Sequence, residues 1–135
     1  MYGITRSISF CYGHRLLGHA GKCRHLHGHN ARAVITLESD TLDEQGMLID
    51  FQELGAVKEW IDAELDHQMI LSREDPLVPL LRNAGERIVV LDWSPTAEHL
   101  ARMLFERVAQ MGYPVRDVTL WETETCRASY RAEPR

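Results

Sequence analysis

Residues 27–38 have the sequence HGHNARAVITLE, and this stretch decides the fold class. Apolar and polar side chains alternate from Ala33 to Glu38, which is the period of a β-strand with one buried face. Residues 2–10, YGITRSISF, alternate in the same way. The sequence therefore predicts two strands, separated by the glycine- and histidine-rich segment 11–26, which we expect to be a long loop.

Two other stretches, 51–65 and 95–111, carry apolar residues at helical spacing. The first follows Asp50, which is expected to be its N-cap with Glu53 as the capping-box partner. The second follows Ser94, the N-cap expected there, because a proline occupies the next position. We predict one helix for each stretch.

Residues 115–123 and 125–132 are predicted to be two closing strands. Segment 70–93 has no clear pattern except a short strand at 87–91. The resulting order, ββααββ, predicts an α+β protein with an antiparallel sheet. Both edges of such a sheet are exposed unless another element or chain covers them.

The chain of 135 residues has the length of one domain, so 1–135 is predicted to be a single domain. Its net charge of −5 argues against a nucleic-acid partner. No apolar run approaches the ~20 residues of a membrane span, and the N-terminus lacks the apolar core of a signal peptide. We therefore expect a cytoplasmic protein without a membrane partner.

Five of the seven histidines lie between His14 and His29. His27 and His29 leave the same face of a strand, and His14 can supply a third imidazole if the two strands pair. Three histidines leave zinc an open position. The alternative is a solvated histidine-rich loop. The sequence is compatible with three roles for Cys23: a fourth metal ligand, a reactive thiolate or a small buried side chain.

Two acidic positions are also candidates. Asp66 precedes His67 at the end of the first predicted helix, where a carboxylate can raise the basicity of an imidazole, although adjacent helical residues do not face each other. Glu122 ends an apolar strand face and would need hydrogen-bond donors if it were buried. The two parallel N–H donors of an aminopyrimidine ring would suit it. The alternative for Asp66, His67 and Glu122 is that they are exposed surface residues without a function.

These motifs, in this order, resemble the 6-pyruvoyltetrahydropterin synthase and 6-carboxytetrahydropterin synthase family. The matching pieces are GHRL around His14, KCRHLHGHN, MLIDF, LDH, SPTAEHLA and WETETCRASY. The resemblance implies the tunnelling fold, a four-stranded antiparallel sheet with two helices on one face. It also implies homo-oligomers, trimers or hexamers, whose subunits close a barrel and whose active sites lie at subunit interfaces.

The resemblance also implies roles for individual residues. By position, the family's zinc ligands correspond to His14, His27 and His29, the catalytic thiol to Cys23, the proton-relay pair to Asp66 and His67, and the acid that anchors the pterin ring to Glu122, with Glu124 as the fallback. The implied substrate is 7,8-dihydroneopterin triphosphate, and the cofactor is Zn²⁺. Candidates for holding the triphosphate are Arg15, Lys22 and Arg24.

Two reactions compete within the family. The carboxy branch yields 6-carboxytetrahydropterin, acetaldehyde and triphosphate and feeds queuosine synthesis, whereas the pyruvoyl branch eliminates triphosphate and feeds tetrahydrobiopterin synthesis. We favour the carboxy branch, because its bacterial members are small chains with a cysteine four residues before His-x-His. Gln68 and the long segment 69–93 depart from the family pattern and leave a different pterin substrate open. The remaining alternative is a non-catalytic module in which Cys23 is the fourth protein ligand of the zinc ion.

Overall fold

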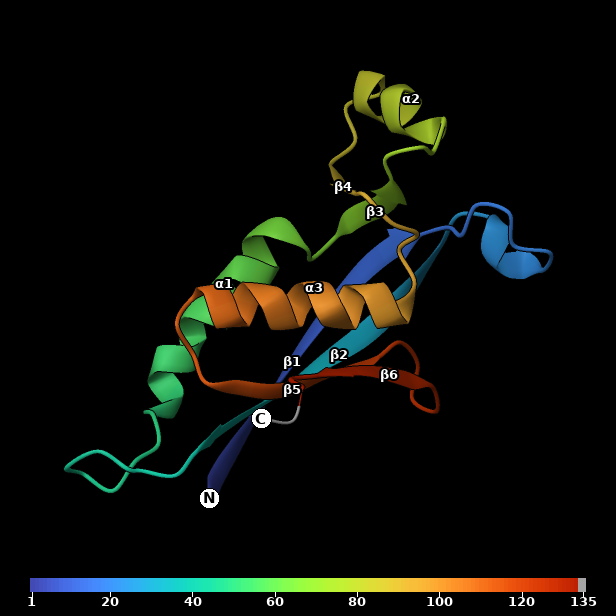
Figure 1. Ribbon diagram of the computed structural model, residues 1–135. Coiled ribbons are helices and arrows are strands. Elements are labelled where there is room, and N and C mark those ends of the chain that lie inside the picture. The colour runs from blue at the N-terminus through green and yellow to red at the C-terminus, as the bar shows by residue number, and fades with distance from the viewer. Residues whose placement is uncertain (134–135) are drawn as a thin grey trace.

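A long antiparallel hairpin forms the centre of the molecule. In the computed structural model, which describes residues 1–133, strands β1 (Tyr2–His14) and β2 (His27–Ser39) pair along their whole lengths (Figure 1). Both predicted strands are confirmed, but β1 continues four residues into the segment expected to be a loop. This extension matters because it carries His14 onto the sheet. The last two residues of the predicted domain lie outside the described part.

The sheet has six strands, in the order β4-β3-β1-β2-β5-β6. Strands β5 (Val115–Trp121) and β6 (Arg127–Arg131) continue the antiparallel pattern beyond β2, as predicted. Strands β3 (Gln68–Ser72) and β4 (Ile88–Leu91) add to β1 in parallel. The expectation of a four-stranded, wholly antiparallel sheet was therefore wrong, while the α+β class is confirmed.

The two added strands come from the segment whose sequence pattern is least clear. Between them lies the short helix α2 (Leu77–Asn83), and together they project from one end of the sheet (Figure 1). Parallel strands need a crossover connection, and α2 provides it between β3 and β4. The short strand expected at 87–91 is confirmed as β4, whereas β3 was missed because its apolar run 69–71 shows no alternation.

The two predicted helices are present with shifted starts. The first stretch opens as a 3₁₀ turn (Phe51–Leu54) and continues as α1 (Gly55–Glu64), and the side chain of Asp50 accepts a hydrogen bond from the backbone N–H of Gln52. The second helix, α3 (Ala97–Gln110), is capped by Thr96, which accepts from the N–H of His99. The predicted N-cap Ser94 was therefore two residues too early.

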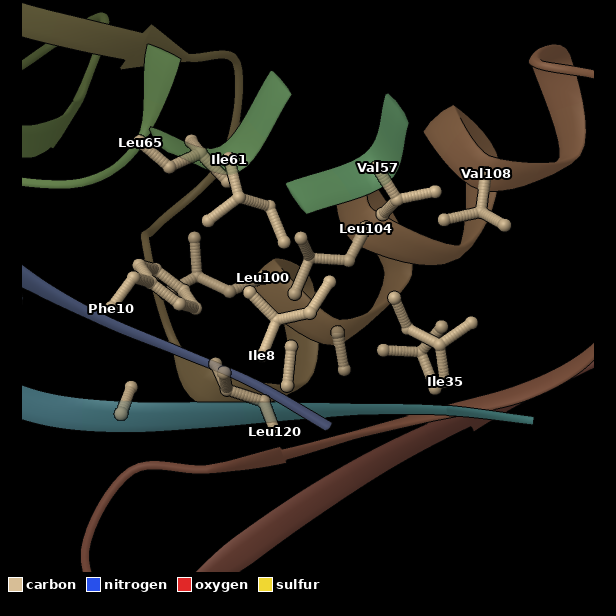
Figure 2. Close-up of a cluster of buried hydrophobic side chains, with 14 of the residues drawn as sticks. Ile8, Phe10, Ile35, Val57, Ile61, Leu65, Leu100, Leu104, Val108 and Leu120 are labelled. Carbon is tan, nitrogen blue, oxygen red and sulfur yellow. The ribbon is translucent and has the colours of Figure 1, made fainter. Parts of the chain in front are cut away.

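Helices α1 and α3 both cover one face of the sheet, as the resemblance implied (Figure 1). Figure 2 shows Val57 and Ile61 of α1 and Leu104 of α3 meeting Ile8 and Ile35 from the central hairpin. All five side chains are almost completely buried, and each contributes about 1.5–3 kcal/mol by leaving water. No helix among residues 1–133 is long and apolar enough to cross a membrane.

Candidate metal centre

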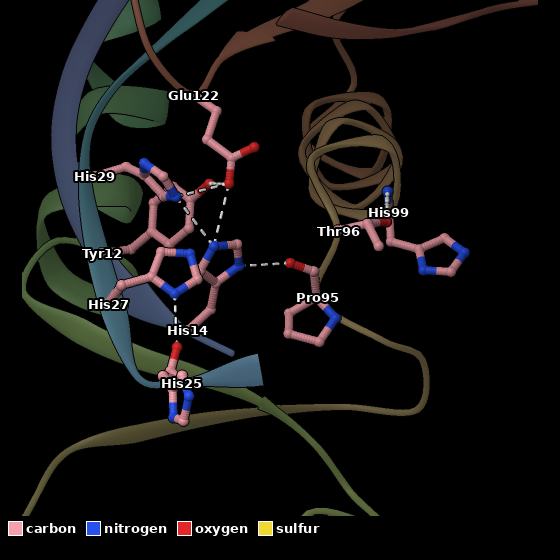
Figure 3. Close-up of polar contacts among 9 residues, drawn as sticks. All are labelled: Tyr12, His14, His25, His27, His29, Pro95, Thr96, His99 and Glu122. Carbon is pink, nitrogen blue, oxygen red and sulfur yellow. Dashed lines mark hydrogen bonds and ion pairs between the residues drawn. The ribbon is translucent and has the colours of Figure 1, made fainter. Parts of the chain in front are cut away.

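Three histidine rings meet where β1 ends and β2 begins. The strand register places His14 opposite His27, and His29 lies two residues farther along the same face of β2. The ring centroids lie 4.5 Å apart for His14 and His27, 5.1 Å for His14 and His29, and 5.0 Å for His27 and His29. The pairing of the two strands thus gathers the three predicted ligands (Figure 3).

Backbone carbonyl groups fix the orientation of two of these rings. The Nδ1 atom of His14 lies 2.7 Å from the carbonyl oxygen of Pro95, and Nδ1 of His27 lies 2.7 Å from that of His25. Since a carbonyl can only accept, both Nδ1 atoms must donate. A neutral ring then keeps its lone pair on Nε2, which is the arrangement typical of metal-binding histidines.

Glu122 completes the cluster from the chain segment that follows β5. Its Oε1 atom lies 3.1 Å from Nε2 of His14 and 2.8 Å from Nε2 of His29. When Nε2 of His14 is also protonated, its hydrogen bond to Glu122, supported by the charge of His29, lowers the pKa of the Glu122 carboxyl despite its partial burial. Glu124, the fallback for this position, is exposed. The cluster therefore combines three imidazoles with one carboxylate.

The geometry of this cluster calls for a cation. The Nε2 atoms of His14 and His29 are 3.2 Å apart and both face the carboxylate oxygen of Glu122. Lone pairs and a negative oxygen at such distances repel each other unless a proton or metal ion lies between them. Burial lowers the pKa of His29. The charge of Glu122 raises this pKa, whereas His14 and His27 lower it further. The neutral imidazole, which is the form that binds metal, is thereby favoured.

The donor set fits zinc. Two nitrogen ligands at 2.0–2.1 Å from a tetrahedral zinc ion lie about 3.3 Å apart, close to the 3.2 Å between the two Nε2 atoms. The ligand atoms of all four residues lie within 4.8 Å of one another. In the described residues 1–133, Cys23 is not part of this group. The arrangement thus argues against a site closed by the thiol, and three histidine ligands would leave zinc an open position beside Glu122.

Tyr12 also belongs to this site, although no motif in the sequence singles it out. Its side chain is buried, with 2% of its surface exposed, and its hydroxyl donates to Oε1 of Glu122 at 3.4 Å. Its ring packs edge-on against His14 at 5.1 Å between centroids. Burial, reinforced by the charge of Glu122, raises the pKa of the Tyr12 phenol, which therefore stays protonated. Only strand alternation with His14 could have placed it on this face.

We expect Tyr12→Phe to weaken zinc binding by about 10-fold without unfolding the protein, since partners of ligand groups contribute on this scale. The substitution keeps the ring that packs against His14 and removes only the donor to Glu122. Competition with a chromophoric chelator would measure the affinity. Tyr130→Phe, a strand tyrosine that packs against Phe105, is the matched control. Equal affinities in the two variants would contradict a role for the Tyr12 hydroxyl.

Cys23 lies in the 3₁₀ turn Lys22–Arg24, between the two long strands. Its side chain is half-buried, and its carbonyl accepts a hydrogen bond from the N–H of Leu16. This bond ties the turn to the segment that follows β1. The structure thus places Cys23 on a loop next to the strand ends that carry the histidines, and outside the group of ligand atoms.

Asp66 and His67 occupy the turn between α1 and β3. His67 adopts a left-handed backbone conformation with φ of 60°, so the two side chains face each other, with 2.9 Å between Nδ1 and Oδ2. Neighbouring residues diverge within a helix, but here α1 has already ended, so the expected divergence does not occur. The N–H of Cys11 donates to Oδ1 of Asp66 at 2.9 Å, and this hydrogen bond lowers the pKa of that carboxyl.

The three candidates for holding triphosphate differ in their surroundings. Arg15 is engaged by Asp75, with its Nε atom 2.7 Å from Oδ2 and a second contact from its other guanidinium nitrogen to Oδ1. The Asp75 side chain is 1% exposed, so the pair is fixed. Lys22 and Arg24 are exposed on the turn around Cys23. Of the three, these two have the more accessible side chains.

We expect Asp75→Asn to lower the free energy of unfolding by about 3 kcal/mol at neutral pH, because it leaves a partly buried Arg15 without its counter-ion. Burial alone would raise the pKa of Asp75, but the hydrogen bonds from Arg15 and from the N–H of Leu77 bring it below its ordinary 3.8. This stabilisation is therefore present above pH 3.8 and is lost as the pH falls through the lower folded-state pKa. Urea unfolding from pH 7 to pH 2 would measure it, and a difference from the parent protein that did not shrink in acid would contradict it.

Comparison with known proteins identifies relatives of this chain. The family model described as 6-pyruvoyl tetrahydropterin synthase matches residues 3–133. A curated relative from Rickettsia typhi, named 6-carboxy-5,6,7,8-tetrahydropterin synthase, is 36% identical over 93% of this chain and 97% of its own length. A relative of the same name from Aquifex aeolicus is 35% identical over 83% of this chain and 77% of its own.

Solved structures agree with these sequence matches. An uncharacterized protein from Wolinella succinogenes superposes with a TM-score of 0.81 at 29% identity, covering 98% of each chain. The 6-pyruvoyl tetrahydropterin synthase of Caenorhabditis elegans superposes with a TM-score of 0.73 at 25% identity, covering 98% of this chain and 96% of its own. The tunnelling fold expected from the sequence is thus confirmed, and the chain belongs to the 6-pyruvoyl tetrahydropterin synthase family.

Proposed function

We propose that this protein is a zinc-dependent 6-carboxy-5,6,7,8-tetrahydropterin synthase. It would convert 7,8-dihydroneopterin triphosphate to 6-carboxytetrahydropterin, acetaldehyde and triphosphate, as a lyase serving queuosine synthesis in the cytoplasm. The convergence of His14, His27 and His29 beside Glu122 carries the proposal. The name shared by relatives that are 35–36% identical to this chain supports the carboxy branch.

The three histidines hold the ion that this chemistry needs. Zinc bound there would polarise the hydroxyl groups of the substrate side chain and acidify the neighbouring C–H bonds. The carbonyl groups of Pro95 and His25 keep Nε2 of His14 and His27 directed at the ion. Because these partners are backbone atoms, the ligand orientation does not depend on a neighbouring side chain.

Cys23 acts as the base that removes or delivers the substrate proton, and His67 with Asp66 resets its protonation state. Within one chain, the thiol is grouped neither with the three histidines nor with His67 among residues 1–133. We infer that the complete site contains residues of two subunits, with the thiol or its partners supplied by the second one. This agrees with the expectation that the active sites lie at subunit interfaces. The trimer or hexamer would also cover the outer edges of β4 and β6.

Glu122 anchors the pterin ring through the oxygen that the cluster does not use. Its contacts with His14, His29 and Tyr12 all involve Oε1. Oε2 has no hydrogen-bond partner among residues 1–133 and can accept an N–H of the aminopyrimidine. Lys22 and Arg24 are the side chains we assign to the triphosphate, because Arg15 is neutralised by Asp75.

Product analysis of the zinc-loaded protein tests this function. We expect incubation with 7,8-dihydroneopterin triphosphate to yield 6-carboxytetrahydropterin together with acetaldehyde, both identified by mass spectrometry. Release of 6-pyruvoyltetrahydropterin would instead place the protein in the pyruvoyl branch. A zinc-replete oligomer that formed neither product would overturn both activities, and would favour a different pterin or a non-catalytic module.

A further inference from the structure

A second group of metal-ligating side chains lies apart from the histidine cluster. It consists of Cys11 on β1 and of Asp66 and His67 in the turn after α1. A cysteine sulfur, a carboxylate oxygen and an imidazole nitrogen lie there within 4.8 Å of one another. We propose that these three residues form a second divalent-cation site, selective for thiophilic ions such as Zn²⁺.

Backbone hydrogen bonds hold the three residues together before any ion binds. The N–H of Cys11 donates to Oδ1 of Asp66 at 2.9 Å, and the N–H of His67 donates to the carbonyl of Cys11 at 2.8 Å. These two bonds join β1 to a turn that is 55 residues away in the sequence. A site whose ligands are already positioned loses less conformational entropy on binding.

The backbone conformation of His67 contributes to this arrangement. Its φ of 60° lies in the left-handed region, which costs a non-glycine residue about 1–3 kcal/mol and persists only where surrounding contacts enforce it. The same conformation turns the imidazole back toward Asp66, with 2.9 Å between Nδ1 and Oδ2. Without it, the imidazole and the carboxylate of adjacent residues would not share one site.

The donor types decide which ion fits. Thiolate and imidazole suit zinc, and hard cations such as Mg²⁺ and Ca²⁺ prefer oxygen ligands only. On binding, the metal–sulfur bond replaces the thiol proton, which is released to water. Three protein ligands leave a tetrahedral ion one position for a water molecule.

An ion can also reach the site. The His67 side chain is 77% exposed in the single chain. Cys11 lines a shallow cavity of about 420 Å³ together with Asn30 and Met69, and His27 and His29 line the same cavity. Cys11 alternates with the buried Tyr12 along β1, so its thiol points to the sheet face that does not pack against α1 and α3. The Cys11 thiol and the three imidazoles therefore leave opposite faces of the sheet, although residues of both groups line this cavity.

Occupation of this site would inhibit the enzyme. This consequence rests on the proposed function, in which His67 exchanges protons with Cys23. A metal ion on the imidazole nitrogen and on the Asp66 carboxylate removes both groups from proton transfer. The protein would then need one zinc ion for activity and would be inhibited by a second.

Cobalt substitution tests the site independently of turnover. Co²⁺ bound by histidine and carboxylate shows visible d–d bands, whereas a thiolate ligand adds an intense sulfur-to-cobalt charge-transfer band in the near ultraviolet. We expect titration of the metal-free protein to give two bound equivalents, one with the thiolate band. Cys11→Ser should abolish that band and keep the other equivalent, while Cys23→Ser should leave the band in place.

His67→Asn is the second variant, because asparagine tolerates the left-handed conformation of this position better than most residues. It should weaken the thiolate-containing equivalent by at least about 10-fold, since even the partners of ligands contribute this much. Because His67 is exposed, this substitution should leave the fold intact, and it tests the site even if Cys11→Ser folds poorly. A single equivalent, or a thiolate band that survives Cys11→Ser, would overturn the site. Loss of the band in Cys23→Ser would overturn it as well, because Cys23 would then be the thiolate ligand.

Inhibition is measured separately, on the one-zinc enzyme. We expect added Zn²⁺ to stop turnover reversibly, and Cys11→Ser to need about 10-fold more zinc for the same inhibition. Equal inhibition of both proteins would overturn the inhibitory role. Because the cobalt spectra need no substrate, they report on the second site even if the protein proves not to have the proposed function.

Discussion

His27→Ala protein is expected to be isolated without zinc and without measurable turnover, while remaining folded. The substitution removes one of three imidazoles whose Nε2 atoms converge beside Glu122. Loss of a partner to a metal ligand already costs about 10–100-fold in affinity, so loss of the ligand itself should exceed about 100-fold. His27 is only half-buried at the start of β2, so the cost in folding free energy should be small. Metal analysis after gel filtration gives the zinc content per chain.

His25→Ala is the matched control for this experiment. His25 is exposed two residues earlier, and its carbonyl oxygen, which accepts from Nδ1 of His27, survives the substitution. The control should therefore keep its zinc. If both variants retained one zinc per chain, the three-histidine site would be wrong, and the region would be a solvated histidine-rich loop.

Cys23→Ser is expected to keep zinc and to lose activity by about 10²–10⁴-fold in kcat, the range for loss of a general base or acid. The thiol is outside the group formed by the three histidines and Glu122, so zinc content should match that of the parent protein. A serine hydroxyl has nearly the same size but is a far weaker acid. It therefore does not form the anion that would act as the base. Single-turnover kinetics with quantified zinc separates the two effects.

Cys126→Ser controls for general effects of replacing a thiol. Cys126 is exposed, and the one hydrogen-bond contact of its sulfur among residues 1–133 is with the Thr125 hydroxyl. Its replacement should change neither zinc content nor kcat. Zinc lost together with activity in Cys23→Ser would support a non-catalytic module in which the thiol closes the metal site.

Periodicity in the sequence predicted the longer elements of the fold. Strands of seven or more residues and helices of ten or more contain enough repeats to reveal a buried face, so β1, β2, β5, α1 and α3 were all predicted. The short strands β6 and β4 were predicted within 125–132 and 87–91, whereas β3 was missed because its apolar run 69–71 shows no alternation. The parallel pairing of β3 with β1 and of β4 with β3 is something that no local pattern reveals.

The same distinction between local pattern and long-range contact applies to the candidate site. The sequence by itself determined the types of chemistry present, because His14, His27 and His29 have the spacing that two paired strands bring to one ion. Only the tertiary structure decided what surrounds them: the Pro95 carbonyl on His14, the Tyr12 hydroxyl on Glu122, and the backbone of Cys11 on Asp66. Each of these contacts joins residues at least 55 positions apart. Local spacing fixes which side of an element a residue occupies, whereas such contacts exist only once the sheet and helices have packed together.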